Sequence, residues 1–202
     1  MIETLFAQRL DDHLNELARH YSRSPNTAKA VTYLHLAGQQ ATGHSTYAEA
    51  VGHFTRGLDL LRKLADYPER ARHELEFQFA LAKSLRFTKG LGAEETGRAL
   101  IRARELCEKV GDDTELFAVL QGMAAYRQVR RSDSNAARDL AEQLLALAER
   151  TNDILDLPFA VGAKVLSEAL PVKTREPAQE VAPDPIFRRL NFSSADSAGV
   201  SF

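Results

Sequence analysis

Histidine is the residue type in this chain best suited to metal chemistry, and the spacing of the histidines argues against a metal site. His13 and His20 are seven residues apart and would share a helix face, but the pair lacks the Cys or carboxylate partners that complete a zinc site. His73-Glu74 begins like the H-E-x-x-H helix of zinc proteases, yet Phe77 stands where the second histidine belongs. We therefore predict no metal site and no cofactor.

Glycine and cysteine also offer no catalytic pattern. Gly90, Gly92 and Gly97 resemble a glycine-rich loop, but no strand precedes them and their spacing differs from a dinucleotide fingerprint. Cys107 stands beside Leu106 in a helical pattern with no base placed near it, which is typical of a packed thiol. We expect a protein without catalytic activity.

The amino-acid composition and net charge of the chain indicate which classes of binding partner to expect. The chain has 202 residues, of which 44% are hydrophobic and 27% charged, and its net charge is −2. Nucleic acids and membranes usually require a basic excess, so neither is expected as a partner. A single cysteine excludes an intramolecular disulfide and favours a reducing compartment. The acidic start of the chain lacks the features of a signal peptide, and we expect a cytoplasmic protein.

The clearest structural pattern spans residues 31–63 and predicts two amphipathic helices joined by a tight turn. Small residues recur where two helices must touch, and large ones recur where they must fill a groove. The predicted buried positions are Leu34, Ala37, Gly38 and Ala41 in the first helix, and Ala50, Phe54, Gly57, Leu58 and Leu61 in the second.

Helical periodicity continues on both sides of this hairpin, and no segment alternates as a strand would, so the predicted fold class is all-α. The expected helices cover about 4–22, 25–42, 46–64, 68–89, 94–110, 114–131 and 135–150. For the fourth of them, the predicted apolar positions are Ala71, Leu75, Phe79, Ala82, Leu85 and Phe87.

Polar residues and glycines mark the expected helix ends. Ser24 is the predicted N-cap before Pro25, Gly43 the predicted stop, and Thr46 with Glu49 a predicted capping box. Later expected signals are the helix-ending residues Gly90 and Gly111, the cap Asp113, and a cap at either Asp133 or Ser134.

The last part of the chain has a different composition. We assign residues 1–153 to a helical-repeat domain and 154–170 to a possible terminal helix that would begin at Pro158. Residues 171–202 hold four of the seven prolines and no clear period, which predicts a disordered tail. The island IFRRLNF at 186–192 leaves two alternatives open, an unstructured segment or a segment that docks on the helices or on a partner.

The hairpin at 31–63 resembles the tetratricopeptide repeat, whose period is roughly 34 residues. In the first helix a large residue is followed by two small residues and then by another small residue, and in the second helix Ala is followed by an aromatic and then a small residue. Leu34 stands where the tetratricopeptide pattern prefers Trp, and Ala41 stands where it prefers Tyr. Ala50, Ala99 and Ala137 hold comparable places in three successive hairpins. This resemblance implies a right-handed α-solenoid of tetratricopeptide-like hairpins.

A longer resemblance covers roughly residues 5–153. It is carried by the successive runs HLNELARHYSRSPNTAKAVTYLHLAGQQA, YAEAVGHFTRGLDLL, PERARHELEFQFALAKSL, RARELCEKVGD and ARDLAEQLLALAERTND. They resemble the helical-repeat region of bacterial signalling proteins that carry a class III adenylate/guanylate cyclase domain and an AAA-type ATPase. The G-x-x-x-x-G-K-[ST] loop of the ATPase and the paired metal-binding Asp residues of the cyclase have no counterpart in this chain, so those activities are not expected.

The tetratricopeptide resemblance also implies a binding face. In such stacks the first helix of each pair lines a concave groove, and the residues placed there are His35, Gln39, Lys83, Arg86 and Arg127. The subclass that clamps acidic chain ends has Lys and Asn at the places of His35 and Gln39, so that ligand is not expected. For the cluster of Arg127, Arg130 and Arg131, interaction with the helix dipole and contact with an anionic partner both stay open.

We therefore expect a module for protein–protein interaction in signalling, which binds a protein or peptide along its concave face. The alternative is a detached or truncated regulatory region of a cyclase–ATPase protein. A small-molecule ligand between hairpins stays open as a third hypothesis.

Overall fold

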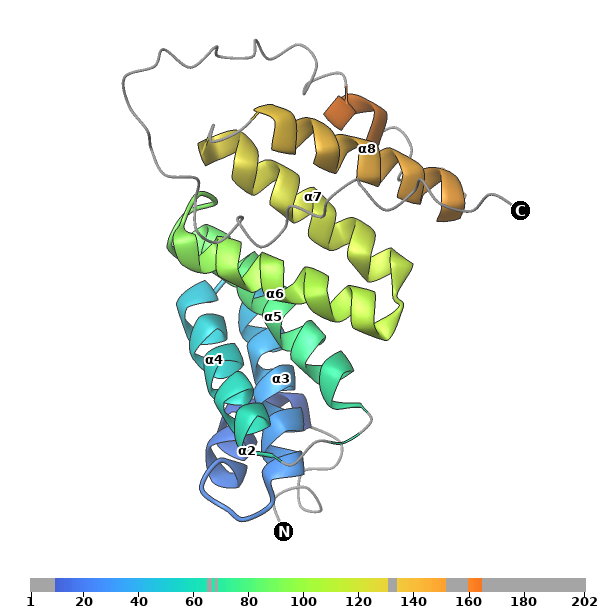
Figure 1. The fold of residues 1–202 in the computed structure, drawn as a ribbon. Coiled ribbons are helices and arrows are strands. Elements are labelled where there is room, and N and C mark those ends of the chain that lie inside the picture. The colour runs from blue at the N-terminus through green and yellow to red at the C-terminus, as the bar shows by residue number, and fades with distance from the viewer. Residues whose placement is uncertain (1–9, 65–66, 68, 131–133, 152–159, 165–202) are drawn as a thin grey trace, which may run out of the picture.

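The fold consists of α-helices that follow one another along the chain and pack in that order (Figure 1). A computed structural model describes residues 10–64, 67, 69–130, 134–151 and 160–164. Within them the elements are η1 (Leu10–His13), α2 (Leu14–Tyr21), α3 (Thr27–Gly43), α4 (Tyr47–Lys63), α5 (Arg70–Thr88), α6 (Glu94–Val110), α7 (Asp113–Arg130) and α8 (Ser134–Thr151). The described part of the chain contains no strand, which confirms the all-α prediction.

Each of the helices from α2 to α8 packs mainly against the helix before it and the helix after it, and α3 also touches α5. In Figure 1, α3 and α4 stand steeply, whereas α6, α7 and α8 run across the view, so the helix direction turns along the stack. Residues 160–164 are helical as well, in agreement with the helix expected after Pro158. The predicted tail at 171–202 and the island at 186–192 lie outside the described residues.

Small residues allow α3, α4 and α5 to approach one another closely. All nine positions predicted to be buried in the hairpin at 31–63 are buried. A Cβ atom added to Gly38 would overlap the ring of Phe54, and one added to Gly57 would overlap the ring of Phe77. The two phenylalanine rings then meet edge to face, with centroids 6.1 Å apart.

The apolar side chains form two clusters that meet at α5. One joins α2, α3 and α4 to Phe77 of α5, and the other joins α6, α7 and α8 to Leu75 of α5. Leu81 packs against both clusters. Since α5 is covered on several sides, its buried residues do not follow a single stripe, and Phe77 was not among the predicted core positions. Phe87, predicted as a core residue, is instead 57% exposed and stacks on Tyr47 with centroids 4.3 Å apart.

The start of α3 corrects one predicted cap. Asn26, not Ser24, is the N-cap, and its side-chain oxygen accepts a hydrogen bond from the backbone N–H of Lys29 at 3.1 Å. The Ser24 hydroxyl accepts from the Asn26 N–H at 3.2 Å and so braces the turn before the helix.

The turn between α3 and α4 corrects one further prediction and agrees with another. The capping box does not form, because the Thr46 hydroxyl donates to the Ala41 carbonyl at 3.0 Å instead of bonding to the start of α4. Gly43 is the last residue of α3, as predicted, and the left-handed conformation in this turn is taken by Ser45, with φ of 60°.

The remaining helix ends agree more closely with the sequence. Gly90 and Gly111 both adopt positive φ, 97° and 76°, as predicted for residues that follow a helix. The cap of α7 is Asp112 and not Asp113, since Asp112 Oδ1 accepts from the Glu115 N–H at 3.0 Å. Ser134 is already inside α8, and Asp133 lies outside the described residues.

The predicted first helix at 4–22 is described only from residue 10 onward. Residues 10–13 form a 3₁₀ turn, of the kind often found at the start of an α-helix, and α2 begins at Leu14. No helix in the described residues is long and apolar enough to cross a membrane.

Candidate functional site: the face formed by α3, α5 and α7

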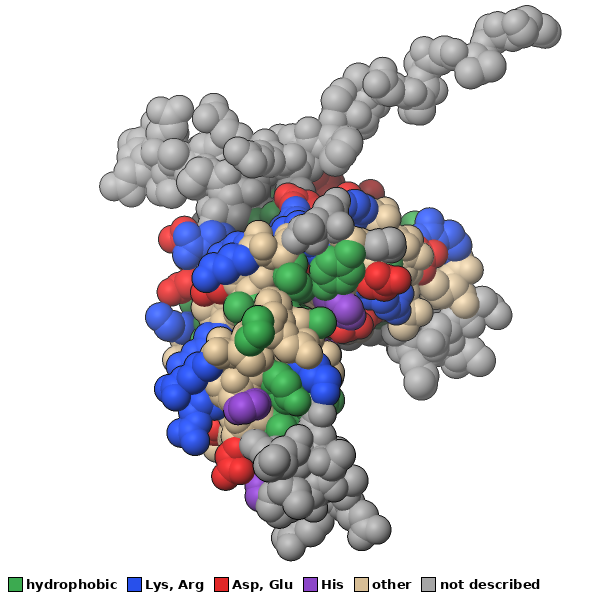
Figure 2. All heavy atoms as spheres, turned by 90° about the horizontal axis from the view of Figure 1, so that it is seen from below, with side chains coloured by type: hydrophobic (Ala, Val, Ile, Leu, Met, Phe, Trp, Pro, Cys, Tyr) green, Lys and Arg blue, Asp and Glu red, His purple; other side chains and the backbone are tan. Residues whose placement is uncertain are grey.

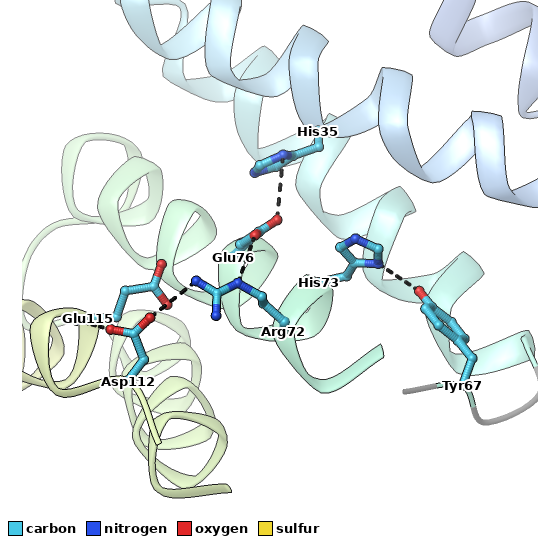
Figure 3. Close-up of polar contacts among 7 residues, drawn as sticks. All are labelled: His35, Tyr67, Arg72, His73, Glu76, Asp112 and Glu115. Atoms are coloured by element: carbon cyan, nitrogen blue, oxygen red, sulfur yellow. Dashed lines mark hydrogen bonds and ion pairs between the residues drawn. The ribbon is translucent and has the colours of Figure 1, made fainter. Parts of the chain in front are cut away.

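Polar side chains from three alternate helices meet on one face of the stack (Figure 3). His35 of α3 points toward Glu76 of α5, with Nδ1 4.0 Å from Oε2. Arg72, one turn before Glu76, approaches Glu76 Oε1 at 4.0 Å and donates to Asp112 Oδ2, at the start of α7, at 3.2 Å. Asp112 in turn caps α7 through the Glu115 N–H. We call His35, Arg72, Glu76, Asp112 and Glu115 the central cluster.

The central cluster has more acidic than basic groups. Three carboxylates face one guanidinium, and Arg72 lies closer to Asp112 than to Glu76. Burial, helped by the nearby Asp112 charge, raises the pKa of Glu115, whose Oε2 atom is buried without a hydrogen-bond partner among the described residues. Burial also lowers the pKa of His35, against the opposing pull of Glu76, so the imidazole is neutral at pH 7. The cluster is therefore net negative.

A cavity of about 370 Å³ opens beside the central cluster, between α3 and α5. Its walls are mostly apolar, and its polar groups include His35, Glu76, and the pair Tyr67 and His73, which share a hydrogen bond of 2.9 Å. The apolar lining residues are Ala28, Val31, Leu36, Leu64 and Phe77, together with the methyl-bearing Thr32. We call this cavity the α3–α5 pocket. Seen from below, hydrophobic, histidine and acidic side chains lie together near the middle of the surface, whereas Lys and Arg gather along one edge (Figure 2).

The five residues predicted to line the groove have different surroundings. His35 is part of the central cluster, and its ring lies 5.1 Å from that of Phe77. Gln39, one turn later on α3, is exposed. Lys83 is exposed as a residue, but its ammonium lies 4.0 Å from the centre of the Phe79 ring; partial burial of that group lowers its pKa, and Glu115 opposes this shift. Arg86 is exposed and Arg127 is partly buried.

Arg86 lies in the last turn of α5 and is not part of the central cluster. Its guanidinium lies 4.9 Å from the centre of the Phe87 ring, and that ring stacks on Tyr47 at the start of α4. Arg130, from the predicted arginine cluster, donates to the Gly92 carbonyl at 3.2 Å and so ties the end of α7 to the turn before α6. Arg131 lies outside the described residues.

Sequence reasoning missed Arg72, Glu76, Asp112 and Glu115 as members of the site. A signal for the first two was present, because positions 72, 76 and 83 share one face of α5, and Lys83 had already been assigned to it. His73 was considered only as the start of a protease motif, and the structure places it in the α3–α5 pocket.

In the part of the chain that the structure describes, no group of three or more His, Cys, Asp or Glu residues is arranged to hold a metal ion. Cys107 is buried, and burial raises the pKa of its thiol to about 12, which makes it a poor nucleophile.

A larger cavity, of about 750 Å³, lies over α5 between α4 and α6. Two of the five basic side chains described in its wall pair with acids of the same wall: Arg62 with Asp59 at 2.9 Å and Lys89 with Glu95 at 3.3 Å. Glu74, also in its wall, accepts from Arg102 at 2.7 Å. Arg70 and Arg98 also line this cavity, so basic groups outnumber acidic ones among the described residues of its wall. We keep the central cluster and the α3–α5 pocket as the candidate site because the cluster combines side chains from α3, α5 and the start of α7.

Comparison of the chain with protein-family models, curated proteins and solved structures gave no match.

Proposed function

We propose that this protein is a non-catalytic, tetratricopeptide-like helical-repeat module that binds an extended protein segment along the face of α3, α5 and α7. The observation that carries the proposal is the convergence of His35, Glu76 and Asp112, from three alternate helices, on one face (Figure 3). A regular stack of hairpins, as in a solenoid, would bring alternate helices to one face, so this convergence supports the proposed arrangement. The sequence resemblance to the repeat region of cyclase–ATPase signalling proteins supports a regulatory role for that binding.

Charge on this face is divided along the helices. The acidic groups Glu76, Asp112 and Glu115 lie toward the starts of α5 and α7, whereas Lys83 and Arg86 lie toward the end of α5. An extended segment with a basic part and an acidic part would match this division in one direction only. Charge complementarity would thus set the direction in which the segment binds.

The test is selection of peptides from a random display library on the full chain, followed by calorimetry with the enriched peptides. Reversal of both basic residues, Lys83→Glu with Arg86→Glu, should weaken binding at least tenfold. The matched control reverses two exposed residues of α4, Arg56→Glu with Lys63→Glu, and should leave affinity unchanged.

Two outcomes would contradict the proposal. One is a selection that enriches no peptide whose binding depends on the face of α3, α5 and α7. The other is a peptide that loses affinity with the α4 control and keeps it with the α5 reversal.

A further inference from the structure

The α3–α5 pocket has the size and lining of a site for one small group and not for a large cofactor. Its volume, about 370 Å³, lies near the lower end of the roughly 300–1,000 Å³ typical of ligand pockets. Val31, Leu36 and Phe77 provide apolar walls from two helices. A saturated chain of a few methylene groups would fit such walls.

The charge of the pocket indicates which group the end of the bound methylene chain would carry. Glu76 is an acidic group in the wall, and no Lys or Arg is among the described residues that line it. His35 is neutral at pH 7, because burial lowers its pKa. An anionic group would be repelled by Glu76 and would find no Lys or Arg in the described wall of the pocket, whereas a cation would pair with Glu76.

Glu76 is available for such a pair. Its contacts with His35 and Arg72 are both 4.0 Å, longer than a hydrogen bond, and Arg72 is engaged by Asp112 at 3.2 Å. Figure 3 shows the Glu76 carboxylate between His35 and Arg72, on the side of α5 that faces α3. The aromatic residues Phe77 and Tyr67 also line the pocket, and aromatic rings attract cations.

We propose that the α3–α5 pocket binds the alkylammonium end of a lysine side chain of the bound segment, with its methylene groups against Val31, Leu36 and Phe77 and its ammonium at Glu76. This inference rests on the proposed function, since the lysine belongs to the segment held along α3, α5 and α7. It adds a specificity: a lysine is required at one position of that segment.

The test uses small probes on the full chain, so it does not depend on an identified partner. N-acetyl-lysine methylamide is titrated while the imidazole proton signals of His35 and His73 are followed by NMR. The matched neutral probe is N-acetyl-norleucine methylamide, which keeps the methylene chain and lacks the ammonium. The lysine probe should shift both signals with a saturating curve and bind at least tenfold tighter than the norleucine probe.

Variants test whether the charge of Glu76 causes the preference for the lysine probe. Glu76→Gln should remove the preference for lysine over norleucine, whereas Glu142→Gln, an exposed acid on α8, should retain it. Equal binding of the two probes to the unmodified chain would overturn the proposal, as would a lysine preference that survives Glu76→Gln. Tighter binding of free 1,4-diaminobutane than of the lysine probe would also overturn it, in favour of a free polyamine.

The experiments distinguish an error in the lysine assignment of the pocket from an error in the proposed peptide-binding function. If the probes leave His35 and His73 unchanged while a selected peptide binds and depends on Lys83 and Arg86, the lysine assignment is wrong and the binding face stands. If the lysine probe binds through Glu76 but no peptide is selected, the pocket stands and the peptide-binding function is wrong.

Discussion

At the scale of single residues, the absence of a side chain matters as much as its presence. Gly57 of α4 leaves the space that the Phe77 ring of α5 fills, and Gly38 leaves the space for Phe54. Side chains in a close-packed interior cannot shift to admit an extra atom without moving their neighbours. The approach of α3, α4 and α5 therefore depends on these two glycines.

Gly57→Ala should lower the free energy of unfolding by about 1–3 kcal/mol, because the added methyl group overlaps the Phe77 ring. The control on the same helix is Gly52→Ala, where a Cβ atom meets nothing within 4 Å. That change should stabilise the chain by roughly 0.5–1 kcal/mol through the higher helix propensity of alanine. Urea unfolding measures both, and equal effects at the two positions would contradict this packing.

His35 should make stability depend on pH. Burial lowers its pKa in the folded chain below the ordinary 6.5, so the unfolded chain takes up protons more readily than the folded chain. This stabilising contribution is complete above about pH 6.5 and is lost as the pH falls toward the lowered folded pKa. His53 is shifted in the same direction and has the same sign.

The free energy of unfolding should therefore fall more between pH 7.5 and pH 5.5 in the unmodified chain than in His35→Gln. Urea unfolding at the two pH values gives the comparison, in which each chain is its own reference. An identical decrease in both chains would show that His35 carries no such proton linkage.

At the scale of helices, the sequence located the elements better than their ends. The pattern of small and large residues at Leu34, Gly38 and Phe54 was enough to predict the α3–α4 hairpin, because both faces lie within one local stretch. Phe77 could not be predicted as a core residue in the same way, since its space is made by Gly57 on another helix. Helix caps were mispredicted where adjacent polar residues compete, as Asp112 does with Asp113.

Substitutions of Asp112 and Asp113 can distinguish the contribution of the helix cap to stability from that of the ion pairs. Asp112→Ala should lower the free energy of unfolding by about 1 kcal/mol, because the Glu115 N–H loses its acceptor. Asp112→Asn keeps that acceptor and removes only an exposed ion pair with Arg72, so its effect should stay within about 0.5 kcal/mol. Asp113→Ala, which removes an exposed pair with Arg150, should also have a small effect. Chemical denaturation of the three variants tests the order.

The candidate site could be predicted only in part, because it depends on how neighbouring helices are placed relative to one another. The resemblance to tetratricopeptide repeats placed His35 and Lys83 on the predicted binding face, but it contains no information on the offset between successive hairpins in this chain. That offset brings Arg72 of α5 to Asp112 before α7 and so forms the central cluster. Patterns within single helices could not reveal it.

At the scale of the whole molecule, two apolar clusters share one helix. One cluster is centred on α3 and α4, the other on α6, α7 and α8, and α5 contributes to both. Because most packing is between neighbours in sequence, the stability of each end depends on the helices beside it more than on the distant end.

Leu144→Ala, in the core of α8, should cost about 2–5 kcal/mol locally and speed amide hydrogen exchange in α7 and α8. Exchange in α3 and α4 should change much less. Hydrogen exchange followed by mass spectrometry measures this along the chain. An equal loss of protection from α3 to α8 would show that the molecule unfolds as one cooperative unit.

The buried thiol of Cys107 can report how often the part of the molecule around it opens. It is the single cysteine of the chain, it lies in the cluster of α6, α7 and α8, and its pKa of about 12 leaves almost no thiolate at neutral pH. A thiol-specific reagent can therefore modify it only as often as this part of the molecule opens. The rate of labelling by the reagent therefore reports those openings without any substitution in the chain, and a bound partner that holds the helices together would slow the labelling.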